Sequence, residues 1–253
     1  MEGTNNEYEA FQSFQRTGFT PQYVHVNELK RKTISLEDFS TIFLPGGFSA
    51  GDYIRAGVIF ANRIANASMP ELKKFVDSGK PVIGVCNGFQ VLSELGFLPG
   101  WDHGNSKEVV LGTNTSNRYE CRYTYIRLTS KGGIFSSNFK DDMPYMIPVA
   151  HAEGKIQILE RERNLQKLID QNQVLFRYCD NEGKFGGYPW NPNGSDFDIA
   201  ALSNEHGNVI GLMPHPERMF YRYRKVERDI FSTPAVGEVF FNGIKDYVTR
   251  IGM

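Results

Sequence analysis

The sequence predicts an α/β fold: an open, mostly parallel sheet covered by helices on both faces, with an added antiparallel β portion in the second half. Two observations lead to this prediction. In the first half, short apolar runs bounded by glycine and proline alternate with segments of helical periodicity. In the second half, runs rich in β-branched and aromatic residues dominate. The 253 residues contain no repeat and no obvious linker, so a single domain over 1–253 is expected.

The elements of the first half alternate in type. Ser68 and Glu71 have the spacing of a capping box, which predicts that a helix begins there, and Gly79 is a suitable helix stop. The order expected from the periodicity is a helix over 6–17, strands over 22–26 and 41–44, helices over 54–65 and 68–78, a strand over 80–85 and a helix over 89–95.

The second half is richer in predicted strands. Residues 204–208 have the composition of a hairpin turn, and apolar runs flank them on both sides. Residues 181–198 are rich in glycine, proline and asparagine, and a loop of this length is usually functional or disordered. The expected elements are strands over 121–128, 174–179, 199–203 and 209–213, a helix over 160–171, and a final helix that opens at Thr233 and Pro234.

The N-terminus departs from the usual pattern of a doubly wound fold, which opens with a central strand. This chain opens with a polar turn and then a helix. Either the sheet lacks a strand at this position or the sequence as given begins late, and the second interpretation is preferred.

Composition excludes several function classes. The formal net charge of −1 gives no global basic field for nucleic acid or an anionic membrane. No apolar run approaches the roughly 20 residues that span a bilayer. The three cysteines include no C-x-x-C pair, which fits a reducing compartment, so a cytoplasmic location is expected. No zinc-ligand spacing and no Walker A motif is present, so neither a metal nor a bound nucleotide is indicated.

Residues 84–88 form a G-x-C-x-G motif between a predicted strand and a predicted helix, which is the context of a nucleophile elbow with Cys86 in place of serine. The helix that follows aims backbone N–H groups at the sulfur and favours the thiolate. The alternative is a buried structural cysteine. That alternative is preferred for Cys121 and Cys179, which lie inside strand-like runs, but not for Cys86.

His215 and Glu217 follow an apolar strand, where α/β folds place their sites. His215 is expected to take the thiol proton of Cys86 and return it to a leaving amine, while Glu217 orients the imidazole. The alternative is a rigid Pro-His-Pro turn without a catalytic role.

Two further segments supply candidate binding residues. The Gly46-Gly47 turn predicts an oxyanion hole, with one backbone N–H from this pair and another from Asn87, although it could also be a plain strand-to-helix turn. His151 lies with a carboxylate at a strand end, where a role in the site and an ordinary surface histidine are about equally supported.

Four stretches resemble the class I glutamine amidotransferase subunits of phosphoribosylformylglycinamidine synthase. The Cys, His and Glu set is common to class I amidotransferases. The G-G-F-S-x-G-D-Y and N-P-N-G-S stretches are typical of this member, and the resemblance runs nearly end to end. The stretches are residues 44–53, 84–90, 191–195 and 213–218.

The resemblance implies a flavodoxin-like class I fold and a glutaminase that forms a Cys86 thioester. Ammonia would pass to a separate ATP-dependent synthetase subunit that converts formylglycinamide ribonucleotide to the amidine in purine biosynthesis, and a small third subunit would bridge the complex. ATP and magnesium are expected only in that partner, and no cofactor is expected here. Cys86, His215 and Glu217 would form the triad, and Gly47 and Asn87 the oxyanion hole. Gln90, Gly46 and His151 are the candidate substrate-binding residues.

Two alternatives remain at this stage. The first is an amidotransferase subunit that serves a different synthetase. The second is a non-catalytic regulatory subunit with the same fold. Family members also usually have a hydrophobic strand before the Gly3-Thr4-Asn5 turn, which here follows Met1 and Glu2 directly.

Overall fold

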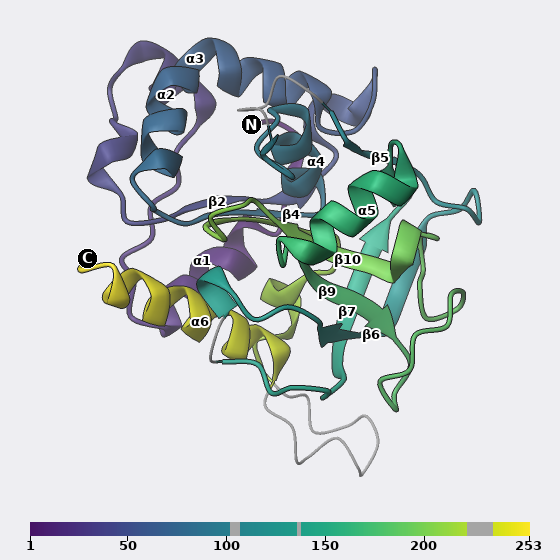
Figure 1. The fold of residues 1–253 in the computed structure, drawn as a ribbon. Helices are drawn as coiled ribbons and strands as arrows, with labels where there is room; N and C mark the ends of the chain where they lie inside the picture. The colour runs from purple at the N-terminus through teal and green to yellow at the C-terminus, as the bar shows by residue number, and fades with distance from the viewer. Residues whose placement is uncertain (102–106, 136–137, 222–234) are drawn as a thin grey trace.

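A computed structural model describes residues 1–101, 107–135, 138–221 and 235–253. A seven-stranded mixed sheet lies at its centre (Figure 1). In spatial order its strands are β2 (Ile42–Leu44), β4 (Val82–Val85), β11 (Val209–Leu212), β10 (Ile199–Ser203), β9 (Val174–Cys179), β6 (Glu120–Leu128) and β7 (Tyr145–His151).

The predicted α/β class is confirmed, and strand direction divides the sheet into two parts. Strands β2, β4 and β11 are mutually parallel. From β11 onwards every neighbouring pair is antiparallel, so the expected antiparallel portion continues the same sheet. Two small sheets lie beside it: β1 (Thr4–Asn5) pairs with β3 (Gly46–Gly47), and β5 (Val109–Thr113) pairs with β8 (Glu153–Ile158).

Helices cover both faces of the parallel strands. In Figure 1, α3 and α4 lie on one side of β2 and β4, and α1 and α6 lie on the other. Because β4 is buried along its whole length, its four residues form an unbroken apolar run rather than an alternating one. The helices are α1 (Glu7–Arg16), α2 (Val26–Arg31), α3 (Val58–Asp77), α4 (Asn87–Glu94), α5 (Arg161–Asp170) and α6 (Val236–Arg250).

Two glycines set the distance between α4 and the sheet. A Cβ atom on Gly88 would lie 2.1 Å from the carbonyl oxygen of Leu44 in β2, and one on Gly84 would lie 2.4 Å from the carbonyl oxygen of Gly88. Any larger residue at either position would push the helix away. The G-x-C-x-G motif therefore fixes the height of Cys86 above the strand ends.

The prediction of a strand over 22–26 is wrong. Residues 21–25 form no regular secondary structure, and α2 begins at Val26. His25 caps this helix, because its Nδ1 atom accepts a hydrogen bond from the Asn27 N–H. Within the described chain no strand pairs with the edge of β2 opposite β4, and residues 22–25 line a cavity together with Phe43 and Leu44 of β2 instead of pairing with that edge.

The helix start predicted at Ser68 is confirmed inside α3. Two helical segments of α3 meet at a kink, and the second begins at Ser68, which has a non-helical φ of −158°, and runs on to Asp77. The Ser68 hydroxyl donates to the Glu71 carboxylate at 2.7 Å, so the capping contact forms inside a kinked helix. Thr233 and Pro234, predicted to open the last helix, lie outside the described residues.

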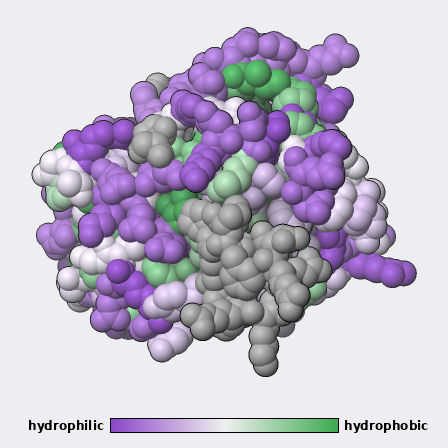
Figure 2. Space-filling view, turned by 90° about the horizontal axis from the view of Figure 1, so that it is seen from below, coloured by the Kyte–Doolittle hydropathy of each residue, from purple (hydrophilic) through white to green (hydrophobic). Residues whose placement is uncertain are grey.

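The face of the molecule shown in Figure 2 is mainly hydrophilic, and apolar residues gather on it only in small areas. Among the helices described, none is both long and apolar enough to cross a membrane.

Candidate active site

Cys86 lies at the junction of β4 and α4 in a strained conformation. Its φ of 52° and ψ of −108° are unusual for a residue with a side chain, and such strain is concentrated at functional sites. The side chain is 5% exposed, and its sulfur lies 3.7 Å from the carbonyl oxygen of Ala150 at the end of β7. This is the strand–turn–helix geometry predicted from the glycine spacing.

His215 is brought to Cys86 by the parallel pairing of β11 with β4. The two strands end together, with Leu212 opposite Val85. Gly46 lies between the two side chains: a Cβ atom there would be 3.0 Å from Cε1 of His215 and 3.3 Å from Cβ of Cys86. The absence of a side chain at Gly46 therefore leaves room for both candidate catalytic groups.

Glu217 completes the predicted set. Its Oε1 atom lies 2.6 Å from Nδ1 of His215, and both residues are almost fully buried. Nδ1 is therefore occupied, while Nε2 has no hydrogen-bond partner within the described chain. Burial opposes a charge on the imidazole, but Glu217 and Cys86 outweigh it and raise the pKa of His215 to about 9. At neutral pH the ring holds a proton that a leaving group can receive.

The predicted oxyanion donors belong to β3 and to the first residue of α4, which directly follows Cys86 in the chain. Gly46 and Gly47 form β3, which β1 anchors, and Gly47 has a φ of 116° with Gly3 and Asn5 backbone atoms too close for a side chain. Asn87 is the first residue of α4, where backbone N–H groups have no intrahelical acceptor. The oxyanion roles of Gly47 and Asn87 remain predictions.

The sequence matches the CobB/CobQ-like glutamine amidotransferase domain over residues 1–245. A phosphoribosylformylglycinamidine synthase subunit PurQ from Picrophilus torridus is 50% identical over 241 residues, 95% of this chain and 93% of that protein. The chain belongs to the PurQ family of glutamine amidotransferases. The PurQ subunit of Archaeoglobus fulgidus is 41% identical over 263 residues, 99% of this chain and 96% of that protein.

Solved structures agree with this PurQ-family assignment. A chain of PurLQS from Thermotoga maritima is 30% identical, with a TM-score of 0.73 over 97% of this chain and 94% of that one. The glutaminase domain of CTPS from Trypanosoma brucei is 16% identical, with a TM-score of 0.56 over 96% and 88%, which shows a shared fold alone.

The side-chain amide of Gln90, a candidate substrate-binding residue, forms hydrogen bonds to other protein groups through both its nitrogen and its oxygen. It donates to the carbonyl oxygen of Glu153 at 2.6 Å and accepts from Nδ2 of Asn87 at 2.9 Å. In this PurQ-family chain, Gln90 therefore ties the start of β8 to the first turn of α4. Its predicted contact with substrate remains untested.

His151 is buried rather than a surface residue. It is 2% exposed, at the end of β7, and neither ring nitrogen has a partner among the residues described. Burial, followed by the nearby charge of His215, lowers its pKa to about 3. The imidazole is therefore neutral at physiological pH.

The N-P-N-G-S stretch forms hydrogen bonds with β8, the strand that carries Glu153. From the sequence alone, this stretch was only a mark of the family. Asn193 is fully buried and donates to the carbonyl oxygen of Gly154 at 2.7 Å. The Ser195 hydroxyl accepts the Ile156 N–H at 2.9 Å. The long loop over 181–198 thus fixes the start of β8.

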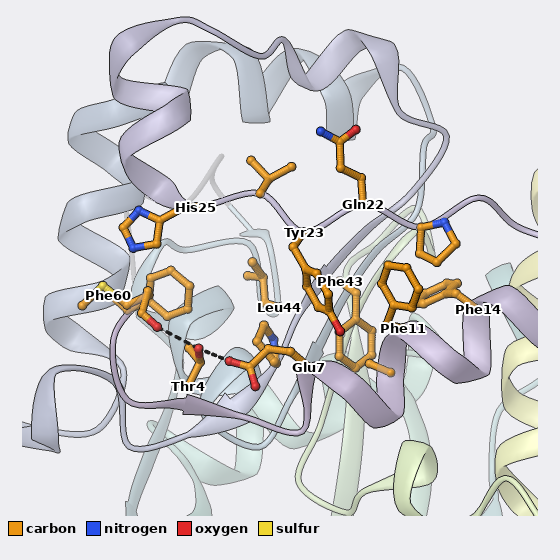
Figure 3. Close-up of a pocket in the computed structure, with 15 residues that line it drawn as sticks. Thr4, Glu7, Phe11, Phe14, Gln22, Tyr23, His25, Phe43, Leu44 and Phe60 are labelled. Atoms are coloured by element: carbon orange, nitrogen blue, oxygen red, sulfur yellow. Dashed lines mark hydrogen bonds between the residues drawn. The ribbon is translucent and has the colours of Figure 1, made fainter.

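An apolar cavity of about 300 Å³ lies along the open edge of β2 (Figure 3). Phe11, Phe14, Tyr23 and Phe43 line it, and it borders the segment that failed to form a strand. Cys86, His215 and Glu217 do not line it, so it is separate from the candidate active site.

Proposed function

We propose that this chain is the glutaminase subunit of a phosphoribosylformylglycinamidine synthase. It hydrolyses glutamine to glutamate and ammonia, and ammonia passes to a synthetase subunit that converts formylglycinamide ribonucleotide to the amidine with ATP. A small third subunit bridges the two, and the complex works in the cytoplasm. The PurQ names of the relatives and the likeness to a PurLQS chain support the partners. The observation that carries the chemistry is the buried grouping of Cys86, His215 and Glu217.

The first half-reaction forms a thioester. The Cys86 thiolate attacks the carboxamide carbon of glutamine, and the negative charge moves to the amide oxygen, where the backbone N–H groups of Gly47 and Asn87 stabilise it. The carbon–nitrogen bond then breaks as His215 gives its proton to the leaving nitrogen, which departs as ammonia. Glu217 keeps the imidazole oriented and offsets its charge. Acid–base help of this kind is worth about 10²–10⁴ in rate.

The second half-reaction clears the enzyme. Neutral His215 takes a proton from water, whose oxygen attacks the thioester carbon. Glutamate leaves, and the protonated His215 and the Cys86 thiolate are restored. We assign no cofactor or metal to this subunit, and ATP and magnesium belong to the synthetase partner. In the described chain, no group of three or more His, Cys, Asp and Glu side chains is arranged to hold a metal.

Covalent labelling with a glutamine-mimicking chloroketone tests this function, read by intact mass and peptide mapping. The expected result is one adduct on Cys86 that excess glutamine prevents, because the reagent must first occupy the substrate site. Cys86→Ala should abolish both the adduct and glutamine hydrolysis while the protein stays folded. Cys121→Ala is the matched control, since Cys121 is an exposed thiol outside the site and its loss should change neither.

Labelling is then repeated with the synthetase subunit present. An adduct that appears only in the complex would still support the proposal, with the site completed by the partner. A folded protein whose Cys86 stays unmodified in both states, or a Cys86→Ala variant that hydrolyses glutamine near the parent rate, would contradict it.

A further inference from the structure

The acidic side chain of the G-G-F-S-x-G-D-Y motif, Asp52, reaches the helix that follows the nucleophile. Asp52 Oδ1 lies 3.5 Å from Nδ2 of Asn87, the residue that follows Cys86. Ala50, Gly51 and Asp52 have φ values of 52°, 69° and 50°. Two of these three residues carry side chains, for which the left-handed region is unfavourable. The loop is therefore held in a strained form that brings a carboxylate beside Asn87.

Glu153 brings another carboxylate to the same place. Its backbone carbonyl accepts from Gln90, one turn after Cys86, and its Oε2 atom accepts the Ala56 N–H at 3.3 Å. Burial raises the pKa of the Asp52 carboxyl to about 6, and the negative charge of Glu153 adds to this effect. The two carboxylates are therefore close enough for the negative charge of Glu153 to raise the pKa of Asp52.

No basic side chain in the described parts of the chain pairs with either acid. Arg55, three residues after Asp52, forms its ion pair with Glu94 instead. Two partly buried carboxylates without a cation repel each other at a cost in free energy, and a cationic ligand group would offset that cost.

Asn87 provides an independent indication of a ligand. Its side chain is fully buried, and its Nδ2 atom faces Asp52 and Gln90, but its Oδ1 atom has no hydrogen-bond partner among the residues that the structure describes. A buried acceptor without a partner costs free energy. An N–H donor bound beside Asp52 would satisfy it.

We propose that Asp52, with Glu153, binds the α-ammonium group of glutamine, and that the Asn87 side-chain oxygen accepts one of its N–H groups. This inference rests on the proposed glutaminase function. Glutamine carries its carboxamide at one end and its ammonium group a few carbon–carbon bonds away. When the carboxamide lies at Cys86, the acids beside the first turn of α4 are placed to receive the other end. Asp52 and Glu153 therefore determine specificity for an amino acid rather than for an amide in general.

Substrate comparison tests this assignment in the complex with the synthetase subunit. The two substrates are glutamine and glutaric acid monoamide, which is glutamine without its α-ammonium group. The wild-type complex should prefer glutamine. Asp52→Asn should lower kcat/KM for glutamine roughly 10- to 100-fold, as expected for a lost charged hydrogen bond, and leave the monoamide almost unchanged. Glu153→Gln should act in the same direction, and Asp170→Asn, on exposed α5, is the matched control.

The alternative is that Asp52 only holds its own loop, since it also accepts a backbone hydrogen bond from Gly57. In that case Asp52→Asn would lower kcat/KM for both substrates by the same factor, and the proposal would be overturned. Wild-type hydrolysis of glutamine through Cys86 would show in the same experiment that the glutaminase function stands. If the wild-type complex does not hydrolyse glutamine, the proposed function fails and this inference fails with it.

Discussion

Single residues explain both what sequence reasoning found in the site and what it missed. Cys86 was predictable because α4 packs so closely on β2 and β4 that positions 84 and 88 have no room for a side chain, and these two glycines mark the junction in the sequence. The position of Asp52 was not predictable, because it depends on a left-handed loop that packs against a helix 35 residues further along the chain. The residues around Asp52 do not by themselves predict which part of the protein its side chain contacts.

His151 leads to a prediction about pH and stability. In the unfolded chain its pKa is near 6.5, whereas in the folded protein it is lowered to about 3. Between these values the unfolded state binds the proton and the folded state does not, so stability is full above pH 6.5 and is lost as the pH falls towards 3. From pH 7 to pH 5 this single group should cost the folded protein about 2 kcal/mol.

The measurement is the free energy of unfolding in urea at pH 7 and pH 5 for the wild type and His151→Asn. The variant should lose less stability over this interval, because asparagine does not titrate, and the difference between the two slopes isolates His151 from other groups. Equal pH dependence in both proteins would contradict this prediction, because it would show that the pKa of His151 is the same in the folded and unfolded states.

At the scale of elements, the sequence predicts a strand well when a neighbouring motif also predicts the strand that pairs with it. Strands β10 and β11 form the predicted hairpin and pair antiparallel. Residues 22–26 have the same kind of local composition, but they pair with no strand among the described residues and form no strand themselves. Strand formation is decided by hydrogen-bond partners and packing, which periodicity alone does not contain.

The brace between the 181–198 loop and β8 gives a prediction at this scale. Asn193→Ala removes the shorter hydrogen bonds to the Gly154 carbonyl and from Ser195, and leaves these buried groups only the longer bonds that Asn191 and Ser195 provide. We expect a loss of roughly 1–3 kcal/mol in unfolding free energy. Because Glu153 precedes Gly154, the KM for glutamine should also rise.

Urea unfolding and steady-state kinetics in the complex check this prediction. Asn181→Ala is the matched control, because Asn181 is an exposed asparagine in the same loop and its removal should leave both quantities unchanged. If the two variants behave alike, the N-P-N-G-S stretch does not support β8.

On the scale of the whole molecule, the site depends on the complete sheet. Gly46 and Cys86 follow β2 and β4, His215 follows β11, and the Ala150 carbonyl comes from β7 at the opposite edge. The sequence predicted the first three because motifs mark strand ends. His151, at the end of β7, was among the candidate site residues. The contact of the Ala150 carbonyl with Cys86 was not predicted, because it depends on how the antiparallel part of the sheet folds over the parallel part.

Because the parallel and antiparallel strands belong to one sheet, we expect the chain to unfold as one cooperative unit. Its two tryptophans lie in different parts of the structure and can report on the unfolding of each part. Trp101 is buried and donates to Gln173 at 2.6 Å, while Trp190 lies in the long loop with its ring 6.1 Å from that of Tyr125 in β6. Trp190→Phe leaves only the first probe, and Trp101→Phe leaves only the second. In each variant, the urea transition measured by fluorescence should coincide with that measured by far-UV circular dichroism. Two separate midpoints within one variant would mean that the two parts of the sheet unfold independently, and the single-domain prediction over 1–253 would then be wrong.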